Sequence, residues 1–183
     1  MFIQTEQTPN PSTLKFLPGR VVMEKGTVDF ADVDAAQSSP LAKRLFAVEG
    51  VERVFLGADF VTVTKAAAGD WQMLKPAILG GIMEHYTSGE PVIAGEAAAI
   101  EGAADDDDEV VAQIKELLET RVRPAVAQDG GDIIFQDFRD GVVYLHMQGS
   151  CSGCPSSTAT LKMGIENLLK HYVPEVVEVQ AAL

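Results

Sequence analysis

The residues best suited to chemistry are the two cysteines, which both lie in the run Cys151-Ser152-Gly153-Cys154. This spacing lets two sulfurs point to the same side of a tight turn and share one metal ion or cluster, and it occurs in redox loops, zinc sites and iron–sulfur sites. Pro155 is suited to the first position of a helix. The free N–H groups and dipole of that helix would favour thiolate, the form that binds metal.

The ligand count limits what one chain can do with these cysteines. Tetrahedral zinc or an iron–sulfur cluster held by cysteines alone takes four thiolates, and one chain supplies two. His146 lies in the middle of a predicted strand, and His171 lies at the far end of the predicted helix, roughly 25 Å from the loop. We therefore expect Cys151 and Cys154 of two chains to complete one exposed site across a two-fold axis. An exposed site that gives up its contents readily suits a carrier.

Three other interpretations of the two cysteines stay open. They could exchange thiol and disulfide as a redox pair, although the loop lacks a Gly-Pro dipeptide and a βαβ context. They could bind a structural zinc ion between two chains. They could also be incidental residues of an interaction protein. The sequence shows no acid–base pair and no nucleophile beyond the thiolates, so we do not expect an enzyme.

Periodicity predicts which elements position the cysteine loop within residues 109–183. A helix over 109–127 should kink or end early at Pro124, and an Asp-Gly turn should join two strands. The loop follows, then a helix from Pro155 to Pro174 and a last strand, in the order α-β-β-α-β. The three predicted strands are Ile133–Asp137, Val142–Gln148 and Val176–Val179.

Residues 1–88 are also predicted to form an α+β domain, without cysteine or a phosphate-binding loop. The expected helices run from Pro40 to about Val48 and over Trp71–Tyr86, the second with Met73, Leu74, Ile78, Ile82 and His85 or Tyr86 on one side. His85 is expected to pack or lie at the surface and not to bind metal. Asp29–Gln37 is predicted to be loop. The predicted strands are Met1–Glu6, Thr13–Leu17, Arg20–Met23, Val51–Leu56 and Phe60–Thr64.

The net charge of −13 is concentrated between these two domains. Residues 89–109 contain eight acidic and no basic side chains and are rich in Gly and Ala, which predicts an extended acidic flexible linker over 89–108. The fold class is therefore α+β, with two small α/β-sandwich-type domains, 1–88 and 109–183.

Composition argues against several classes of protein. An acidic chain is poorly suited to nucleic acid, and no apolar run is long enough to span a membrane. The first residues lack the features of a secretory signal or a transit peptide. We expect a cytoplasmic bacterial protein, or a mitochondrial matrix protein if the chain is a processed form.

Several runs of the C-terminal half closely resemble the NifU-like domain of the Nfu family. The opening run Gln4–Phe16 is similar to the N-terminal domain of mitochondrial-type Nfu proteins and their bacterial relatives. The resemblance covers nearly the whole chain except the acidic linker. The C-terminal runs are Gln128-Asp129-Gly130-Gly131-Asp132-Ile133, Asp140-Gly141-Val142-Val143, Gly149–Lys162, Gly164-Ile165-Glu166-Asn167 and Val173-Pro174-Glu175-Val176.

The resemblance implies an iron–sulfur cluster scaffold or carrier. In this family a [4Fe–4S] cluster is bridged between two C-terminal domains, so the ligand roles fall to Cys151 and Cys154, and [2Fe–2S] is left open. It also implies a homodimer when cluster is bound, delivery to apo-proteins such as lipoyl synthase and aconitase-type enzymes, upstream assembly factors as partners, and an N-terminal domain that helps recognise clients.

Overall fold

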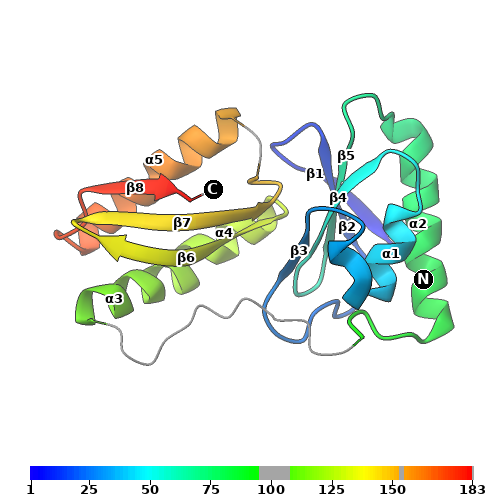
Figure 1. Cartoon of the computed structure of the whole chain (residues 1–183), viewed down its shortest axis with the longest axis horizontal. Helices are drawn as coiled ribbons and strands as arrows, with labels where there is room; N and C mark the ends of the chain where they lie inside the picture. Colours follow the sequence, from blue (N-terminus) through cyan, green and yellow to red (C-terminus); the bar gives the residue numbers. More distant parts are fainter. Residues whose placement is uncertain (95–107, 153–154, 183) are drawn as a thin grey trace. The chain divides into compact units, whose positions relative to one another are not determined.

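The computed structural model describes residues 1–94, 108–152 and 155–182, and for 155–157 it describes only the helical backbone. The chain divides into two compact units, Met1–Glu101 and Gly102–Leu183 (Figure 1). Each unit combines a sheet with helices, which confirms the predicted α+β class.

The N-terminal unit is built on a five-stranded sheet in the order β1-β2-β5-β4-β3, with every neighbouring pair antiparallel. Apolar side chains that alternate along the central strands meet the buried sides of the helices in one core. The strands are β1 Gln4–Gln7, β2 Thr13–Leu17, β3 Val28–Phe30, β4 Val51–Leu56 and β5 Val61–Lys65; the helices are the 3-10 helix η1 Ala35–Ser38, α1 Pro40–Phe46 and α2 Trp71–Ser88.

Two predicted segments of this unit are wrong. Arg20–Met23 forms no strand; instead the N–H groups of Val22 and Met23 both donate to the carbonyl of Ala58, at 2.8 and 3.2 Å. The predicted loop Asp29–Gln37 contains part of β3 and most of η1. The polar residue Asp29 interrupts the apolar pattern of this strand, so the sequence did not predict it. In the structure the Asp29 carboxylate forms an ion pair with Arg53 on β4, the neighbouring strand.

Capping residues mark the start of both α-helices of this unit. The Ser39 hydroxyl accepts from the N–H of Ala42 at 3.0 Å, and the Asp70 carboxylate accepts from the N–H of Gln72 at 2.9 Å. The inward side of α2 differs from the prediction at one position, because Met73 is 77% exposed. The buried side chains are Leu74, Ile78, Ile82 and His85.

Residues after α2 stay attached to the N-terminal unit as far as Ala94. Ser39 donates its hydroxyl to the Val92 carbonyl at 2.7 Å, and the Ala94 N–H donates to the Ser38 carbonyl at 2.7 Å. The assignment of 89–108 as a flexible linker mostly concerns residues 95–107, which lie outside the described residues, so it stays a prediction.

The C-terminal unit has the predicted order α-β-β-α-β. Its sheet runs β6-β7-β8, with β6 and β7 antiparallel and β7 and β8 parallel. The β6–β7 turn places Asp140 and Gly141 at φ values of 51° and 79°, as an Asp-Gly hairpin requires. The elements are α3 Glu109–Leu117, the π turn η2 Leu118–Val122, α4 Arg123–Gln128, β6 Gly131–Arg139, β7 Val142–Gly149, α5 Pro155–Tyr172 and β8 Glu178–Ala181.

The predicted break at Pro124 is present as a change of helix type. The α-helical turns of α3 widen into η2, and Pro124 then lies in the first turn of α4, where its missing N–H is tolerated. Helices α3, α4 and α5 lie on the same face of the sheet (Figure 1). Their apolar side chains pack with those of the sheet in one core, which includes Ile114, Leu145, Ile165 and Leu169.

Candidate functional site

The cysteine loop joins the end of β7 to the start of α5. Gly149 ends the strand with a φ of 64°, and the Ser152 N–H donates back to the Gly149 carbonyl at 3.1 Å, so the chain turns sharply there. Thr158 on α5 donates its hydroxyl to the Cys151 carbonyl at 3.2 Å. Cys154 lies outside the described residues, so its predicted role stays a prediction.

Cys151 is buried, with only 6% of its surface exposed, and it belongs to the core of the C-terminal unit. This differs from the expectation of an exposed site on the loop. The local sequence, made of Gly and Ser, predicts an open turn. In the structure, however, the start of β6 packs against the loop and covers Cys151.

The segment that covers Cys151 is Asp129–Asp132, which we call the glycine turn. A Cβ atom added at Gly131 would lie 2.6 Å from the Cys151 sulfur and 2.9 Å from the Gln148 carbonyl, far closer than atoms can approach. The thiol therefore lies against the bare α-carbon of Gly131. Gly130 has a φ of 80°, which favours glycine as well.

Ser150 ties the cysteine loop to the glycine turn. Its hydroxyl donates to the Asp129 carbonyl at 2.5 Å, and its N–H donates to the Gly130 carbonyl at 3.2 Å. The register of the sheet supports this contact, because Gly131 on β6 lies opposite Gly149 on β7. Ser150 is 3% exposed, so both bonds are protected from water.

An ion pair anchors the other end of the glycine turn. The buried Asp132 carboxylate accepts from Arg123 Nε at 2.9 Å and from Arg123 Nη2 at 2.8 Å, and its Oδ1 also accepts from the Ile133 N–H at 2.8 Å. Glu119 accepts from the same guanidinium at 2.6 Å. The Asp132 carboxylate is the main cause that raises the pKa of Arg123 above its usual value.

Sequence reasoning missed Ser150, Asp132 and Arg123 as supports of the site. The two adjacent glycines between aspartates were a signal for close backbone approach. The partner of Asp132 lies nine residues away, across the helix end, and could not be assigned from spacing.

Within the part of the chain that the structure describes, the histidines form no metal-binding group with Cys151. His146 lies within β7 opposite Ile134, and exposed His171 lies near the end of α5 beside Tyr172. Among residues 1–94, 108–152 and 155–182 there is no group of three or more His, Cys, Asp or Glu side chains that could hold a metal ion.

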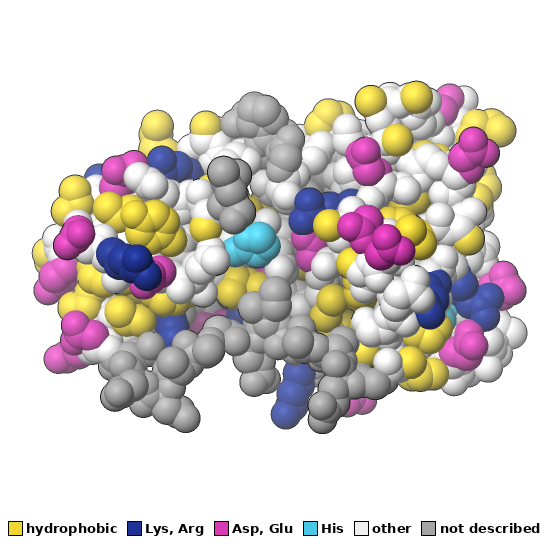
Figure 2. All heavy atoms as spheres, viewed as in Figure 1, with side chains coloured by type: hydrophobic (Ala, Val, Ile, Leu, Met, Phe, Trp, Pro, Cys, Tyr) yellow, Lys and Arg dark blue, Asp and Glu magenta, His cyan; other side chains and the backbone are white. Residues whose placement is uncertain are grey.

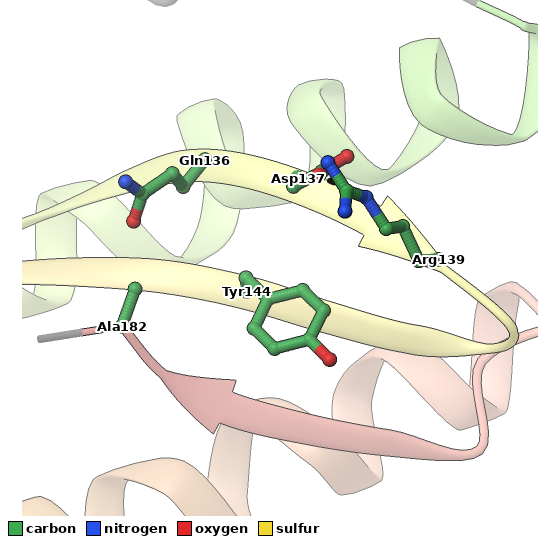
Figure 3. A pocket seen from close by; sticks show the side chains of 5 residues that line it. All are labelled: Gln136, Asp137, Arg139, Tyr144 and Ala182. Atoms are coloured by element: carbon green, nitrogen blue, oxygen red, sulfur yellow. Dashed lines mark ion pairs between the residues drawn. The ribbon is translucent and has the colours of Figure 1, made fainter.

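A separate hollow of about 240 Å³ lies on the face of the sheet that the helices leave uncovered (Figure 3). It is lined by Gln136, Asp137, Arg139, Tyr144 and Ala182. Arg139 donates to Asp137 at 2.6 Å, and its side chain is 76% exposed. This hollow offers a solvent-exposed ion pair without a thiol or an imidazole, so the cysteine loop is the better candidate site.

On the face shown in Figure 2, Lys and Arg side chains are interspersed with Asp and Glu side chains on both units. None of the described helices is both long and apolar enough to cross a membrane.

The fold and the site define a class: a two-unit α+β protein whose second unit carries a Cys-x-x-Cys loop before a long helix. Residues 3–89 match the family model "Scaffold protein Nfu/NifU N terminal", and residues 114–180 match the "NifU-like domain". The chain belongs to the Nfu/NifU family, which confirms the resemblance found in the sequence.

Curated relatives match over almost the whole chain. "NFU1 iron-sulfur cluster scaffold homolog, mitochondrial" of Homo sapiens is 53% identical over 100% of this chain and 72% of its own length. "NifU-like protein 4, mitochondrial" of Arabidopsis thaliana is 57% identical over 96% of this chain and 64% of its own length. The chain thus spans less than two thirds of the plant relative.

Among solved structures, a NifU-like protein from Saccharomyces cerevisiae is similar with a TM-score of 0.48 and 29% identity. The match covers 52% of this chain and 87% of that one.

Proposed function

We propose that this protein is an iron–sulfur cluster scaffold and carrier. Two chains hold one [4Fe–4S] cluster between their C-terminal units, and each contributes Cys151 and Cys154. The observation that carries the proposal is the cysteine pair itself, in a loop before α5 of a NifU-like domain. The name of the human relative, an iron–sulfur cluster scaffold homolog, supports it.

The residues of the cysteine loop fit an iron–sulfur cluster in their chemistry, although the burial of Cys151 does not fit directly. Thiolates are the usual ligands of iron–sulfur clusters, and the loop has small residues that let a cluster approach the backbone. One chain supplies half of a four-thiolate set, so an isologous contact between two chains completes it. The burial of Cys151 is the feature that does not fit directly, since a shared cluster needs a thiol that a second chain can reach.

We also propose which proteins exchange the cluster with this chain and in which compartment they do so. The cargo passes to apo-proteins such as lipoyl synthase or aconitase-type enzymes when an incoming client thiolate displaces Cys151 or Cys154. The N-terminal unit helps to recognise these clients, and upstream assembly factors supply the cluster. The chain acts without catalytic turnover. The names of both curated relatives contain the word mitochondrial, which supports the mitochondrial location over a bacterial cytoplasm.

Anaerobic reconstitution with iron and sulfide tests the ligand set. The unaltered chain should dimerise and take up about four iron and four sulfide per dimer, with a Mössbauer spectrum of a [4Fe–4S] cluster. Cys151→Ala and Cys154→Ala should each lose stable cluster binding, because each removes two of the four ligands in the dimer.

Ser152→Ala is the matched control, since it alters the same loop and keeps both thiols. It should bind cluster like the unaltered chain, and far-UV circular dichroism should show that all three variants fold. A full, stable cluster in either cysteine variant would contradict two-plus-two ligation. Zinc at one ion per dimer, with no uptake of iron and sulfide, would favour a zinc site instead.

A further inference from the structure

Ser150 precedes Cys151 in the chain and links the cysteine loop to the glycine turn, which has no cysteine of its own. Its hydroxyl and its N–H reach two successive carbonyls of the glycine turn, those of Asp129 and Gly130. Of these two bonds, only the hydroxyl bond depends on the side chain. The Thr158 hydroxyl also bonds the Cys151 carbonyl, so the Ser150 hydroxyl bond is one of several contacts, and its loss should lower the free energy needed to open the loop by a modest amount.

The position of the thiol depends on this connection. The Cys151 sulfur lies against Gly131, where a Cβ atom would come within 2.6 Å of it, and the residue is 6% exposed. If the loop moved away from the glycine turn, the sulfur would lose this cover. The Ser150–Asp129 bond therefore helps to hold the thiol in its buried position.

The glycine turn itself is held more firmly than the loop. Asp132 is fixed by two hydrogen bonds from the charged Arg123 side chain and by one from the Ile133 N–H. Charge-assisted bonds of this kind are about twice as strong as neutral ones. The turn thus serves as the fixed side of the contact, against which Ser150 and Cys151 are held.

We propose that Ser150 is a positioning residue that keeps the Cys151 thiol against Gly131 in the cluster-free chain. Release of the Ser150–Asp129 bond then presents the thiol for loading. This inference rests on the proposed function and deepens it, because it explains how a buried cysteine becomes a ligand shared with a second chain.

The test measures how fast Cys151 reacts in the absence of iron. Full-length chain with Cys154→Ser has Cys151 as its one thiol, and iodoacetamide alkylation followed by mass spectrometry gives its rate. Adding Ser150→Ala should raise this rate about five- to tenfold, the effect expected from the loss of one net hydrogen bond. Gly131→Ala, which crowds the sulfur directly, should also raise the rate.

Thr120→Ala is the matched control, because it removes another hydroxyl-to-carbonyl bond in the same unit, from Thr120 to Glu116 at 2.7 Å. It should leave the rate unchanged. Measuring alkylation at low urea concentrations separates local opening, which depends little on urea, from global unfolding, which depends on it strongly. If Gly131→Ala fails to fold, the alkylation rate of the Ser150→Ala variant is sufficient to decide the test.

An unchanged rate in Ser150→Ala would overturn the positioning role, and so would an increase that merely follows global unfolding. Neither result depends on cluster binding. Failure of the unaltered chain to take up iron and sulfide would instead contradict the proposed function, so the two failures can be distinguished.

Discussion

His85 is a fully buried histidine in the core-facing row of α2. Neither ring nitrogen has a hydrogen-bond partner among the described residues, and the ring packs edge-on against Tyr86 with centroids 5.3 Å apart. Burial, and then the positive charge of Arg44, lower the pKa of His85 below its usual 6.5, while Glu90 opposes them. The ring is therefore held in the core in a setting that favours its neutral form, in agreement with the predicted packing role.

This burial predicts that the N-terminal unit loses stability in mild acid. Below pH 6.5 the unfolded chain takes up a proton at His85 that the folded unit resists, so the free energy of unfolding falls as the pH falls from 6.5. His85→Phe should remove part of this dependence, at most about 1.4 kcal/mol per pH unit for one proton. Urea unfolding at pH 7.5 and 5.5, followed by Trp71 fluorescence, measures it.

His171→Phe, which changes an exposed histidine of the other unit, is the control and should leave this pH dependence unaltered. Equal loss of stability on acidification in His85→Phe and in the unaltered chain would show that His85 does not contribute.

At the scale of the element, α2 contains a glycine that its packing does not require. Gly80 is exposed, and a Cβ atom added there would meet nothing within 4 Å. Glycine in a helix interior loses more backbone freedom on folding than alanine does. Gly80→Ala should therefore stabilise the N-terminal unit by about 0.5–1 kcal/mol, measured by urea unfolding with Trp71 fluorescence.

Gly50, in the same unit, gives the opposite expectation. Its φ is 99°, and an added Cβ atom would lie 3.2 Å from Leu74 Cδ2. Gly50→Ala should destabilise the unit by about 1–2 kcal/mol, because a side chain is strained in the left-handed region. A fall in stability for Gly80→Ala would mean that the helix needs the glycine for a reason other than packing.

At the scale of the whole molecule, each unit has its own hydrophobic core. The chain has a single tryptophan, Trp71, whose Nε1 donates to the Pro11 carbonyl at 3.2 Å within the N-terminal unit. Its fluorescence therefore reports on that unit, while circular dichroism reports on both.

Separate cores predict separate unfolding transitions. Leu145→Ala, in the C-terminal core, should destabilise that unit by about 2–5 kcal/mol and leave the Trp71 transition in place. Ile78→Ala, in the N-terminal core, should shift the Trp71 transition instead. If both probes moved together in both variants, the two units would unfold as one.

The predictable elements are those with strong local signals. Ser39 before Pro40, the Asp140–Gly141 turn and the alternation in Thr13–Leu17 each specify an element through neighbouring residues, and the structure has them. The strand at Val28–Phe30 was not predicted, because its stability comes from pairing with β4, which lies more than twenty residues away in the sequence.

The sequence by itself determined the two α+β units, the α-β-β-α-β order around the cysteine loop and the family of the chain, because periodicity, turn chemistry and ligand type are local properties. Only the tertiary structure decided that Cys151 is buried against Gly131, that Ser150 ties the loop to the glycine turn and that Arg123 anchors Asp132. These contacts arise where β6 and β7 pair and α4 ends, so they depend on how separate segments meet in space.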